Sequence, residues 1–283
     1  MRKNGMYLFI FLIISINMYA VTSNGTGPKN INEKEAEEKN EDNVRISILF
    51  DNYVIKEGTE AGWGFSCLVE GTEKTILFDT GANGEILLSN IDNMNVDITK
   101  TDLLVLSHNH YDHTGGIESV LSRNSNIPAF IPVSFPKDFS ETTGIKKINR
   151  VDKPVEICKN VFLTGEMGDQ IKEQSLVINT EAGLVIITGC SHPGIVNILK
   201  RAKEIFNRNI FLVLGGFHLL QHSKSDVEDI IKVFKSIGVM KCGATHCTGD
   251  TQIKIFKDAF KENYIEMGTG RILSISNKGL EIK

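Results

Sequence analysis

Three of the seven histidines of this 283-residue chain lie within six residues, at His108, His110 and His113. Asp112 stands among them, and the apolar run Leu103–Leu106 just before them is typical of a buried strand. Imidazole and carboxylate groups crowded this closely suit neither an apolar core nor a simple surface turn. They suit a metal ion, because zinc and its neighbours prefer neutral imidazole and carboxylate ligands. The sequence therefore predicts a metal centre at the end of a strand.

The spacing of the histidines divides them between two ions. In an extended segment, side chains two residues apart project to the same side, so His108 and His110 can bind one cation. Catalytic zinc usually takes three protein ligands and leaves one position open to water. His192, in a glycine-flanked loop after an apolar run, is the best candidate for the third ligand. A second cation would take Asp112, His113 and His246.

Polar groups follow several predicted strands at the point where each strand ends. The apolar runs concerned finish at Phe78, Leu106, Thr188, Leu214 and Ala244. Loops at strand ends, held by a rigid scaffold, are where catalytic groups usually lie. Because polar groups follow all five strand ends, we expect them to meet in a single site.

The first 43 residues differ in composition from the rest of the chain. Residues 1–21 have a basic start and an apolar run, which predicts a signal peptide or, if uncleaved, an N-terminal anchor. Residues 22–43 are charged and almost free of bulky apolar side chains, which predicts a disordered polar tether. Residues 44–283 are long enough to bury the core of one domain. We expect an exported protein, secreted or periplasmic, that is membrane-anchored only if the signal is not cleaved.

Short β-branched runs and two helical stripes predict an α/β architecture. Strands are predicted at the runs that begin at residues 44, 65, 75, 103, 161, 176, 184, 210, 239 and 271. Apolar residues recur with helical spacing over 194–206 and 226–237. Strands followed by a helix, twice, indicate two packed sheets with helices on their outer faces. Residues 130–151 lack a clear period and are predicted to form a lid beside the site.

Charge and cysteine content narrow the possible partners. The net charge of −4, without a dense Lys/Arg patch, disfavours nucleic acid and leaves a small molecule as the expected partner. The sequence does not indicate an oligomeric state. Cys190 and Cys247 stand beside His192 and His246 in sequence. Their thiolates could bind zinc, but we expect them to pack behind the ligands instead.

The motifs, in their order along the chain, resemble those of the metallo-β-lactamase superfamily. The resemblance spans 44–283 and is carried by Phe78-Asp-Thr-Gly81, by the run from Ser107 to Gly116 and by Gly189-x-x-His192. More narrowly, the sequence resembles a subgroup labelled dihydropterin-linked (ribofuranosyl)aminobenzene phosphate synthase-like, related to an archaeal dihydropteroate synthase. The runs that carry this narrower resemblance are Glu173–Leu176, Gly189–Ile195, Gly215–Leu219 and Thr245–Gly249.

The resemblance implies an αββα four-layer sandwich with the metal site at one edge between the sheets. It implies the same division of ligands between two ions as the spacing does. It also implies that Asp79 accepts a hydrogen bond from a ligand-bearing loop and so fixes the geometry of the ligands.

One position departs from the pattern of the binuclear hydrolases in this superfamily. Those enzymes usually place a bridging Asp where this chain has His218, and Asp226 lies eight residues further on, at the predicted start of a helix. A carboxylate can bridge two cations, whereas a neutral imidazole has one free lone pair and cannot. We therefore expect one firm zinc site and one conditional site, with manganese and iron as alternative metals. His218 is predicted either to bind one metal or to contact substrate.

These observations predict a zinc-dependent hydrolase. A zinc ion lowers the pKa of bound water from about 15.7 to about 7, which makes hydroxide available near neutral pH. Asp112 is predicted to orient that hydroxide and take its proton, and His218 to stabilise the oxyanion. The expected substrate is a small ester, thioester, lactone or phosphoester.

Two other functions stay open. One is a transferase or synthase that acts on a pterin-like, phosphate-bearing substrate, although an exported location fits poorly with intracellular pterin synthesis. The other is a non-catalytic metal-binding or sensing module. A thiol enzyme is rejected, because a Cys and a His as close in sequence as Cys190 and His192 rarely reach each other productively.

Overall fold

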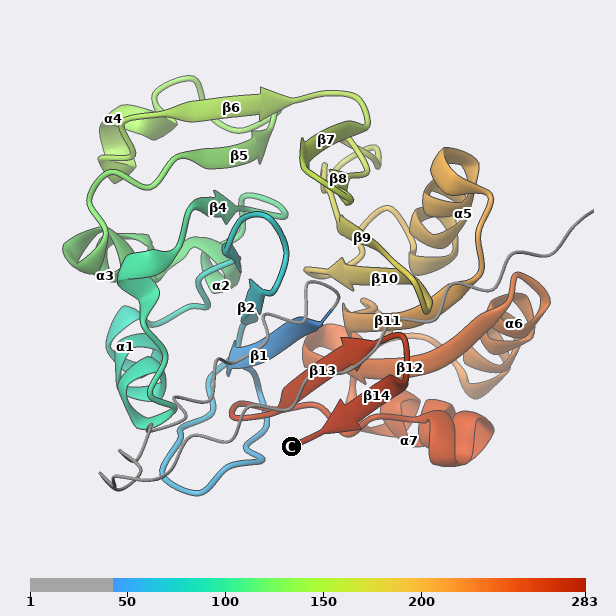
Figure 1. The fold of residues 1–283 in the computed structure, drawn as a ribbon. Coiled ribbons are helices and arrows are strands. Elements are labelled where there is room, and N and C mark those ends of the chain that lie inside the picture. The colour runs from blue at the N-terminus through green and yellow to red at the C-terminus, as the bar shows by residue number, and fades with distance from the viewer. Residues whose placement is uncertain (1–42) are drawn as a thin grey trace, which may run out of the picture. The chain divides into compact units, whose positions relative to one another are not determined.

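Two β-sheets lie face to face in the computed structural model, which describes residues 43–283 (Figure 1). The predicted signal or anchor at 1–21 and the tether at 22–43, except its last residue, lie outside the described residues. The first sheet has the strand order β14-β13-β1-β2-β3-β4-β5-β6 and the second has the order β12-β11-β10-β9-β8-β7. Two packed sheets with helices on both outer faces form the four-layer αββα sandwich that the sequence predicts.

The strands of the first sheet are β1 (Val44–Phe50), β2 (Ser66–Glu70), β3 (Ile76–Phe78), β4 (Leu103–Val105), β5 (Ala129–Pro132), β6 (Ile148–Val151), β13 (Ile272–Ser276) and β14 (Gly279–Ile282). Those of the second sheet are β7 (Val155–Cys158), β8 (Val161–Leu163), β9 (Leu176–Thr180), β10 (Gly183–Thr188), β11 (Ile210–Gly216) and β12 (Val239–Thr245). The helices are α1 (Gly84–Asn93), α2 (Tyr111–Thr114), α3 (Ile117–Arg123), α4 (Phe139–Thr143), α5 (Ile195–Phe206), α6 (Lys224–Ser236) and α7 (Asp250–Phe260). Three short 3-10 turns complete the described elements: η1 (Ile98–Lys100), η2 (His246–Thr248) and η3 (Lys261–Asn263).

Alternation of side chains along each strand builds the four layers. In β10, Val185 and Ile187 face the core between the sheets, whereas Leu184 and Ile186 face the helices. Because successive side chains of a strand point to opposite faces, an unbroken apolar run such as β10 must be covered on both sides. The helices supply that cover.

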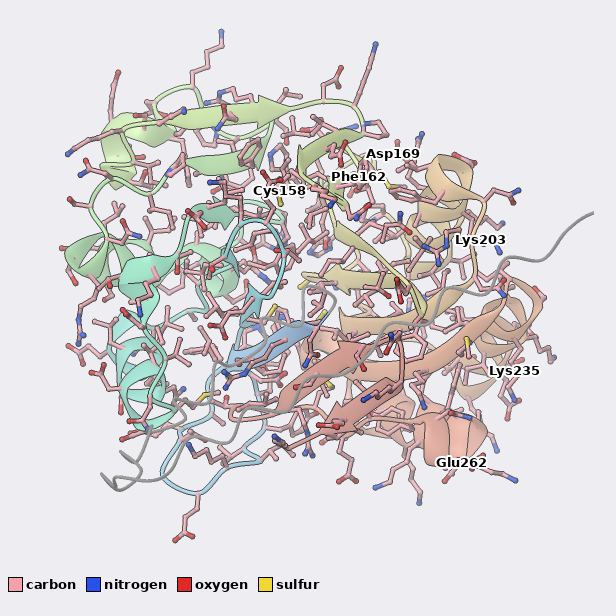
Figure 2. The ribbon with its side chains drawn as sticks, in the orientation of Figure 1. Cys158, Phe162, Asp169, Lys203, Lys235 and Glu262 are labelled. Atoms are coloured by element: carbon pink, nitrogen blue, oxygen red, sulfur yellow. The ribbon has the colours of Figure 1, made fainter. Side chains whose placement is uncertain are left out.

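Each outer face is covered by a separate group of helices. Helices α1 and α3 pack against the first sheet, and α5, α6 and α7 pack against the second, as Figure 1 shows. The predicted stripe of α6 is buried at Val227, Ile231 and Phe234. Lys235 on α6 is exposed at the outer side of this layer, whereas Lys203 on α5 is half-buried and donates to the Ile237 carbonyl at 3.0 Å (Figure 2).

The direction of the strands gathers their carboxyl ends at one edge. Strands β3 and β4 run parallel to each other, and β10, β11 and β12 are also mutually parallel. In open sheets, ligands bind outside the carboxyl ends of parallel strands. The candidate site residues follow these same strands.

The predicted lid is wrong. Residues 130–151 contain β5, α4 and β6, and β5 pairs in parallel with both β4 and β6 inside the first sheet. Ile131, Phe139 and Ile145 are buried against α1 and α3. Pro132 in β5 and the polar residues Asn149 and Arg150 in β6 hide these strands in the sequence, because neither forms the β-branched apolar run of a typical strand. Among residues 43–283, none of the helices is both long and apolar enough to cross a membrane.

Gly215 offers a test of how closely the second sheet is packed at the end of β11. Its φ is +117°, and a Cβ atom there would lie 2.1 Å from the Thr188 carbonyl oxygen. We expect Gly215→Ala to lower the free energy of unfolding by about 2 to 4 kcal/mol, because the backbone would have to move.

Gly58 is the matched control. It also has a positive φ, +82°, but an added Cβ meets nothing within 4 Å. Gly58→Ala should cost only the conformational penalty of about 1 kcal/mol. Urea unfolding of both variants measures the difference, and equal losses would contradict the packing argument.

Candidate metal centre

Three histidine side chains converge at the edge where the two sheets meet. His108 and His110 come from the loop after β4, and His192 from the loop after β10. The ring nitrogens His108 Nε2 and His110 Nδ1 lie 3.1 Å apart. One ligand atom from each of the three residues falls within 4.8 Å of the others. The structure thus brings together the three residues predicted to hold the first cation.

Burial keeps these three imidazoles neutral. Burial, followed by the charges of His218 and His110, lowers the pKa of His192 to about 3. Burial and the neighbouring histidines also lower the pKa of His108 and of His110. A neutral imidazole is the form that binds a metal ion, since a protonated ring has no free lone pair.

A second cluster lies directly beside the first. Asp112 Oδ2 is 3.2 Å from His246 Nε2 and 3.6 Å from His113 Nε2. The rings of His113 and His108 have centroids only 4.2 Å apart, so the two clusters adjoin. The three residues predicted for the second cation are therefore together as well, and the fourth member of this cluster is Cys190.

Asp79 holds the loop that carries most of these side chains. This buried carboxylate accepts hydrogen bonds from the Ser107 backbone N–H, the Ser107 hydroxyl and His113 Nδ1, each at 2.7 Å. Because the Ser107 hydroxyl donates to Asp79, its oxygen is free to accept from His108 Nδ1 at 2.8 Å. With Nδ1 held in this way, each imidazole directs its Nε2 into the site, as metal-ligating histidines do.

Asn52 performs the same task for His246. Its side-chain oxygen lies 2.9 Å from His246 Nδ1, and its amide group donates to the His246 carbonyl. The hydrogen bond leaves His246 Nε2 free to face Asp112. Asn52 has no neighbour in sequence that could have identified it as part of the site.

Glu173 anchors the loop of His192, and sequence reasoning gave it no role. Its buried carboxylate accepts three backbone N–H groups, from Cys190 at 3.0 Å, Ser191 at 2.9 Å and His192 at 2.8 Å. Burial raises the pKa of Glu173 to about 7, although the backbone donors lower it. Its place in a quoted motif was visible in the sequence, but the loop it holds lies 17 to 19 residues away.

The backbone is strained at four positions of the site. Asp79, Ser191, His218 and His246 have φ values of 55°, 67°, 55° and 50°. Non-glycine residues rarely adopt this left-handed conformation, and such strain gathers at functional sites. At Ser191 it turns the chain between Cys190, which lies in the second cluster, and His192, which lies in the first.

The side chain of His218 is exposed and lies over the first cluster. Its ring centroid is 4.3 Å from that of His192, and its ligand atom groups with the sulfurs of Cys190 and Cys247. Asp226 is remote from this role, because it forms a capping box with Ser223 at the start of α6. All five cysteines are free thiols, and four of them are buried.

The two clusters fit divalent cations. His192 Nε2 is buried and has no hydrogen-bond partner, which is costly for a polar atom unless something binds there. In the second cluster, burial opposes protonation of His113, but Asp79 and Asp112 outweigh it and raise its pKa to about 9. The negative charge of the two aspartates therefore favours a positive charge at this position, and a bound cation can supply it in place of the proton.

One large aromatic side chain lies against the centre, and two more exposed side chains are close to it in sequence. The side chain of Trp63, the only tryptophan of the chain, is 53% exposed, and its ring centroid lies 5.1 Å from that of His246. Tyr111, between two candidate ligands in sequence, is 73% exposed, and Leu220, two residues after His218, is 51% exposed. An exposed aromatic ring beside a polar site can serve as a stacking surface for a ligand.

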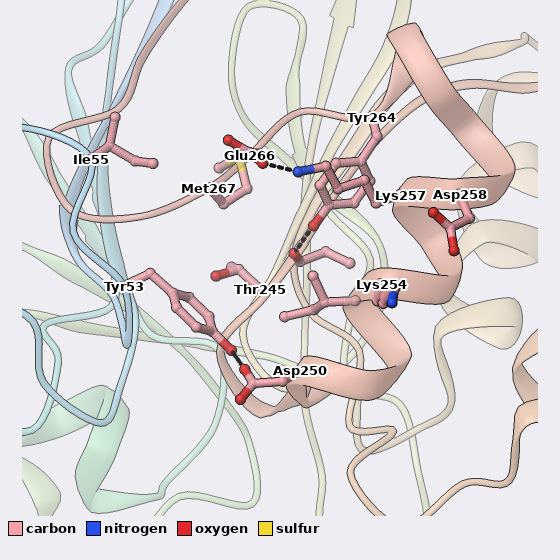
Figure 3. A pocket seen from close by; sticks show the side chains of 12 residues that line it. Tyr53, Ile55, Thr245, Asp250, Lys254, Lys257, Asp258, Tyr264, Glu266 and Met267 are labelled. Carbon is pink, nitrogen blue, oxygen red and sulfur yellow. Dashed lines mark hydrogen bonds and ion pairs between the residues drawn. The ribbon is translucent and has the colours of Figure 1, made fainter.

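A cavity of about 550 Å³ is lined by Thr245, the residue before His246, and by none of the candidate metal ligands (Figure 3). Tyr53 and Asp250 are joined by a hydrogen bond at its edge, and Lys257 pairs with Glu266. Its remaining walls are largely apolar. Because its acidic groups outnumber its lysines, the cavity does not select for an anion.

The fold and the site place this chain in a known class. A sequence model of the metallo-beta-lactamase superfamily matches residues 63–189. Together with the relatives below, this match shows that the chain belongs to the metallo-beta-lactamase superfamily.

Three relatives resemble the chain over nearly their whole length. A 7,8-dihydropterin-6-methyl-4-(beta-D-ribofuranosyl)-aminobenzene-5'-phosphate synthase of Methanocaldococcus jannaschii is 30% identical over 82% of this chain and 97% of its own. MJ0448, an uncharacterised protein of the same organism, is 30% identical over 81% of this chain and 100% of its own. The solved structure of Tm1679, described as a metal-dependent hydrolase of the beta-lactamase superfamily, is 32% identical, with a TM-score of 0.73 over 83% of this chain and 100% of that one.

The role of Asp79 can be tested by Asp79→Asn. An amide has one acceptor oxygen instead of two and would present a donor to Ser107 or His113. We expect metal affinity, measured by competition with a chromogenic chelator, to fall about 10- to 100-fold.

Asp51→Asn is the matched control. Asp51 is equally buried and accepts from the Thr245 hydroxyl at 2.7 and 2.8 Å, but it contacts none of the candidate ligands. Its metal affinity should stay within a few-fold of the wild type. A similar loss in both variants would mean that any buried carboxylate here supports the fold alone.

Proposed function

We propose that this protein is a metal-dependent synthase that acts on a pterin-like, phosphate-bearing small molecule. The observation that carries the proposal is the pair of adjoining ligand clusters, joined through His108 and His113, at one edge of the sandwich. The likeness to the dihydropterin-linked synthase, over almost all of that enzyme, supports the reaction class.

Divalent cations held by the two clusters would polarise a bound phosphate and stabilise the charge that develops as a bond to it breaks. His108, His110 and His192 would hold the first, and Asp112, His113 and His246 the second. We propose zinc as the metal, with manganese and iron as the alternatives, since imidazole and carboxylate suit all three.

Two side chains of the chain can move or hold protons at the reacting atoms. Burial disfavours the charged form of Asp112, but the hydrogen bond and charge of His246 and the charge of His113 outweigh it and hold its pKa below the usual range. Asp112 is therefore a carboxylate that can accept a proton from an attacking group. His218, exposed beside His192, is placed to donate to a departing oxygen, and its contact with Cys247 raises its pKa.

The rim of the site supports a planar substrate. Trp63 offers an exposed aromatic surface beside His246, and a pterin-like ring can stack on it. The substrate's phosphate would be held by the cations, because among residues 43–283 the ion pairs of the candidate ligands are with Asp79 and Asp112 and none is with Lys or Arg.

Hydrolysis of an ester, thioester, lactone or phosphoester is the second candidate. The similarity to Tm1679 favours it, as does Asp112, which could orient an attacking water as readily as it accepts a proton from an amine. We further propose that the partner is a small molecule and not nucleic acid. Export through the N-terminal segment, with anchoring to the membrane if that segment is retained, is part of the same proposal.

The synthase proposal is tested by product analysis on the metal-loaded protein. Incubation with a dihydropterin diphosphate ester and an arylamine ribofuranosyl phosphate should give the condensed product, with release of diphosphate and a proton, detected by mass spectrometry. Removal of the metal with a chelator should abolish the activity, and added zinc should restore it, while the circular dichroism spectrum stays unchanged. Turnover of simple esters or lactones without any condensed product would favour the hydrolase instead.

Trp63 gives a separate test of the substrate class. Trp63→Ala should raise KM for a pterin-like substrate up to about 10-fold, because a stacked aromatic pair contributes about 0.5–1.5 kcal/mol. Trp63→Phe should retain most of the affinity.

Met240→Ala is the control, since Met240 is 50% exposed but lies at the other end of β12 from His246. Binding of substrate should also change the fluorescence of Trp63, which is the chain's single tryptophan. An unchanged KM in Trp63→Ala would show that the ring does not rest on this side chain.

A further inference from the structure

The second cluster contains a sulfur atom that neither the spacing of the motifs nor the resemblance assigned to a metal. Cys190 Sγ lies 3.2 Å from His113 Nε2 and 3.4 Å from His246 Nε2. Cys190 is buried, with 3% of its surface exposed. The sequence led us to expect this thiol to pack behind the ligands, whereas the structure puts it among them.

The distances around this cluster match those between ligands of one tetrahedral ion. For zinc bonds of about 2.05 Å to nitrogen or oxygen and 2.3 Å to sulfur, neighbouring ligands are separated by about 3.3 Å, or about 3.5 Å where one is sulfur. Four of the six separations among the donor atoms run from 3.2 to 3.6 Å: Cys190 to His113 and His246, and Asp112 to the same two histidines. All six lie within 4.8 Å, so one cation can reach the four donor atoms together.

The same geometry bears on the position where superfamily hydrolases place a bridging carboxylate. This chain has His218 there; its ring lies 4.3 Å from that of His192, and its ligand atom groups with the sulfurs of Cys190 and Cys247 but not with Asp112, His113 and His246. The second cluster would have only three ligands without the sulfur. Ser191, with its left-handed backbone, and Glu173, which accepts the Cys190 and Ser191 N–H groups, fix the thiol in this place.

We propose that the thiolate of Cys190 is a ligand of the second cation, together with Asp112, His113 and His246. The thiol proton leaves as the cation binds, and no oxidant or reductant is involved. A thiolate makes this site selective for soft ions such as zinc, cobalt and cadmium over magnesium or calcium. The inference rests on the metal centre of the proposed function but not on the reaction that the centre performs.

Cobalt substitution tests the proposal without an activity assay. Protein loaded with two equivalents of Co²⁺ should show the near-ultraviolet charge-transfer band of a thiolate–cobalt bond. In Cys190→Ser that band should disappear, and affinity for the second cobalt should fall by more than about 100-fold, while the first remains bound.

Cys247→Ser is the matched control. Cys247 is buried to the same extent, adjoins His246 in sequence and lies close enough to donate to the Cys190 carbonyl at 3.5 Å. It groups with His218 and Cys190 but not with the carboxylate and imidazoles of the second cluster. The band should persist in this variant; its loss there and survival in Cys190→Ser would overturn the proposal.

X-ray absorption on the unmodified protein tests the proposal even if Cys190→Ser does not fold. With two zinc ions bound, one sulfur at about 2.3 Å should appear in the zinc scattering. Two bound ions with no sulfur neighbour would overturn the thiolate ligand and leave the proposed function standing. Failure to bind any divalent cation would overturn both.

Discussion

The buried carboxylate of Asp79 is the constraint on which the geometry of the site depends. It joins the loop after β3 to the loop after β4, and its three hydrogen bonds of 2.7 Å fix both the backbone of Ser107 and the ring of His113. Through the Ser107 hydroxyl it also fixes the ring of His108. A buried anion with three donors has a single arrangement of low energy, so the neighbouring imidazoles keep their Nε2 atoms directed at the cations.

Glu173 does for the second sheet what Asp79 does for the first. Its carboxylate gathers three consecutive N–H groups, and the loop it holds presents Cys190 to one cluster and His192 to the other. The strained φ of Ser191 is tolerated because those hydrogen bonds determine its conformation. The two buried carboxylates thus fix the ligand-bearing loops at this edge of the sandwich, so that their side chains form two defined clusters.

Much of the fold could be predicted, because long strands and helices carry a clear period. The apolar runs of β1, β10 and β11 and the stripe of α6 lie where the sequence put them. Strands β5 and β6 escaped prediction, since β5 ends on Pro132 and β6 contains Asn149 and Arg150 in place of an apolar run, and the segment was taken for a lid. Helix α7 was missed as well, although Phe256 and Phe260 on it are buried against the second sheet.

By itself, the sequence determined the chemistry of the centre: which imidazoles and carboxylates follow strand ends, and therefore which residue types can meet. That information is local, because it depends on side-chain type and on the short distance from each strand. Only the tertiary structure decided which partners complete each cluster. Asn52, Glu173 and Cys190 reach the site from elements far from the 108–113 run in sequence, and no pattern in the chain encodes a contact made across two sheets.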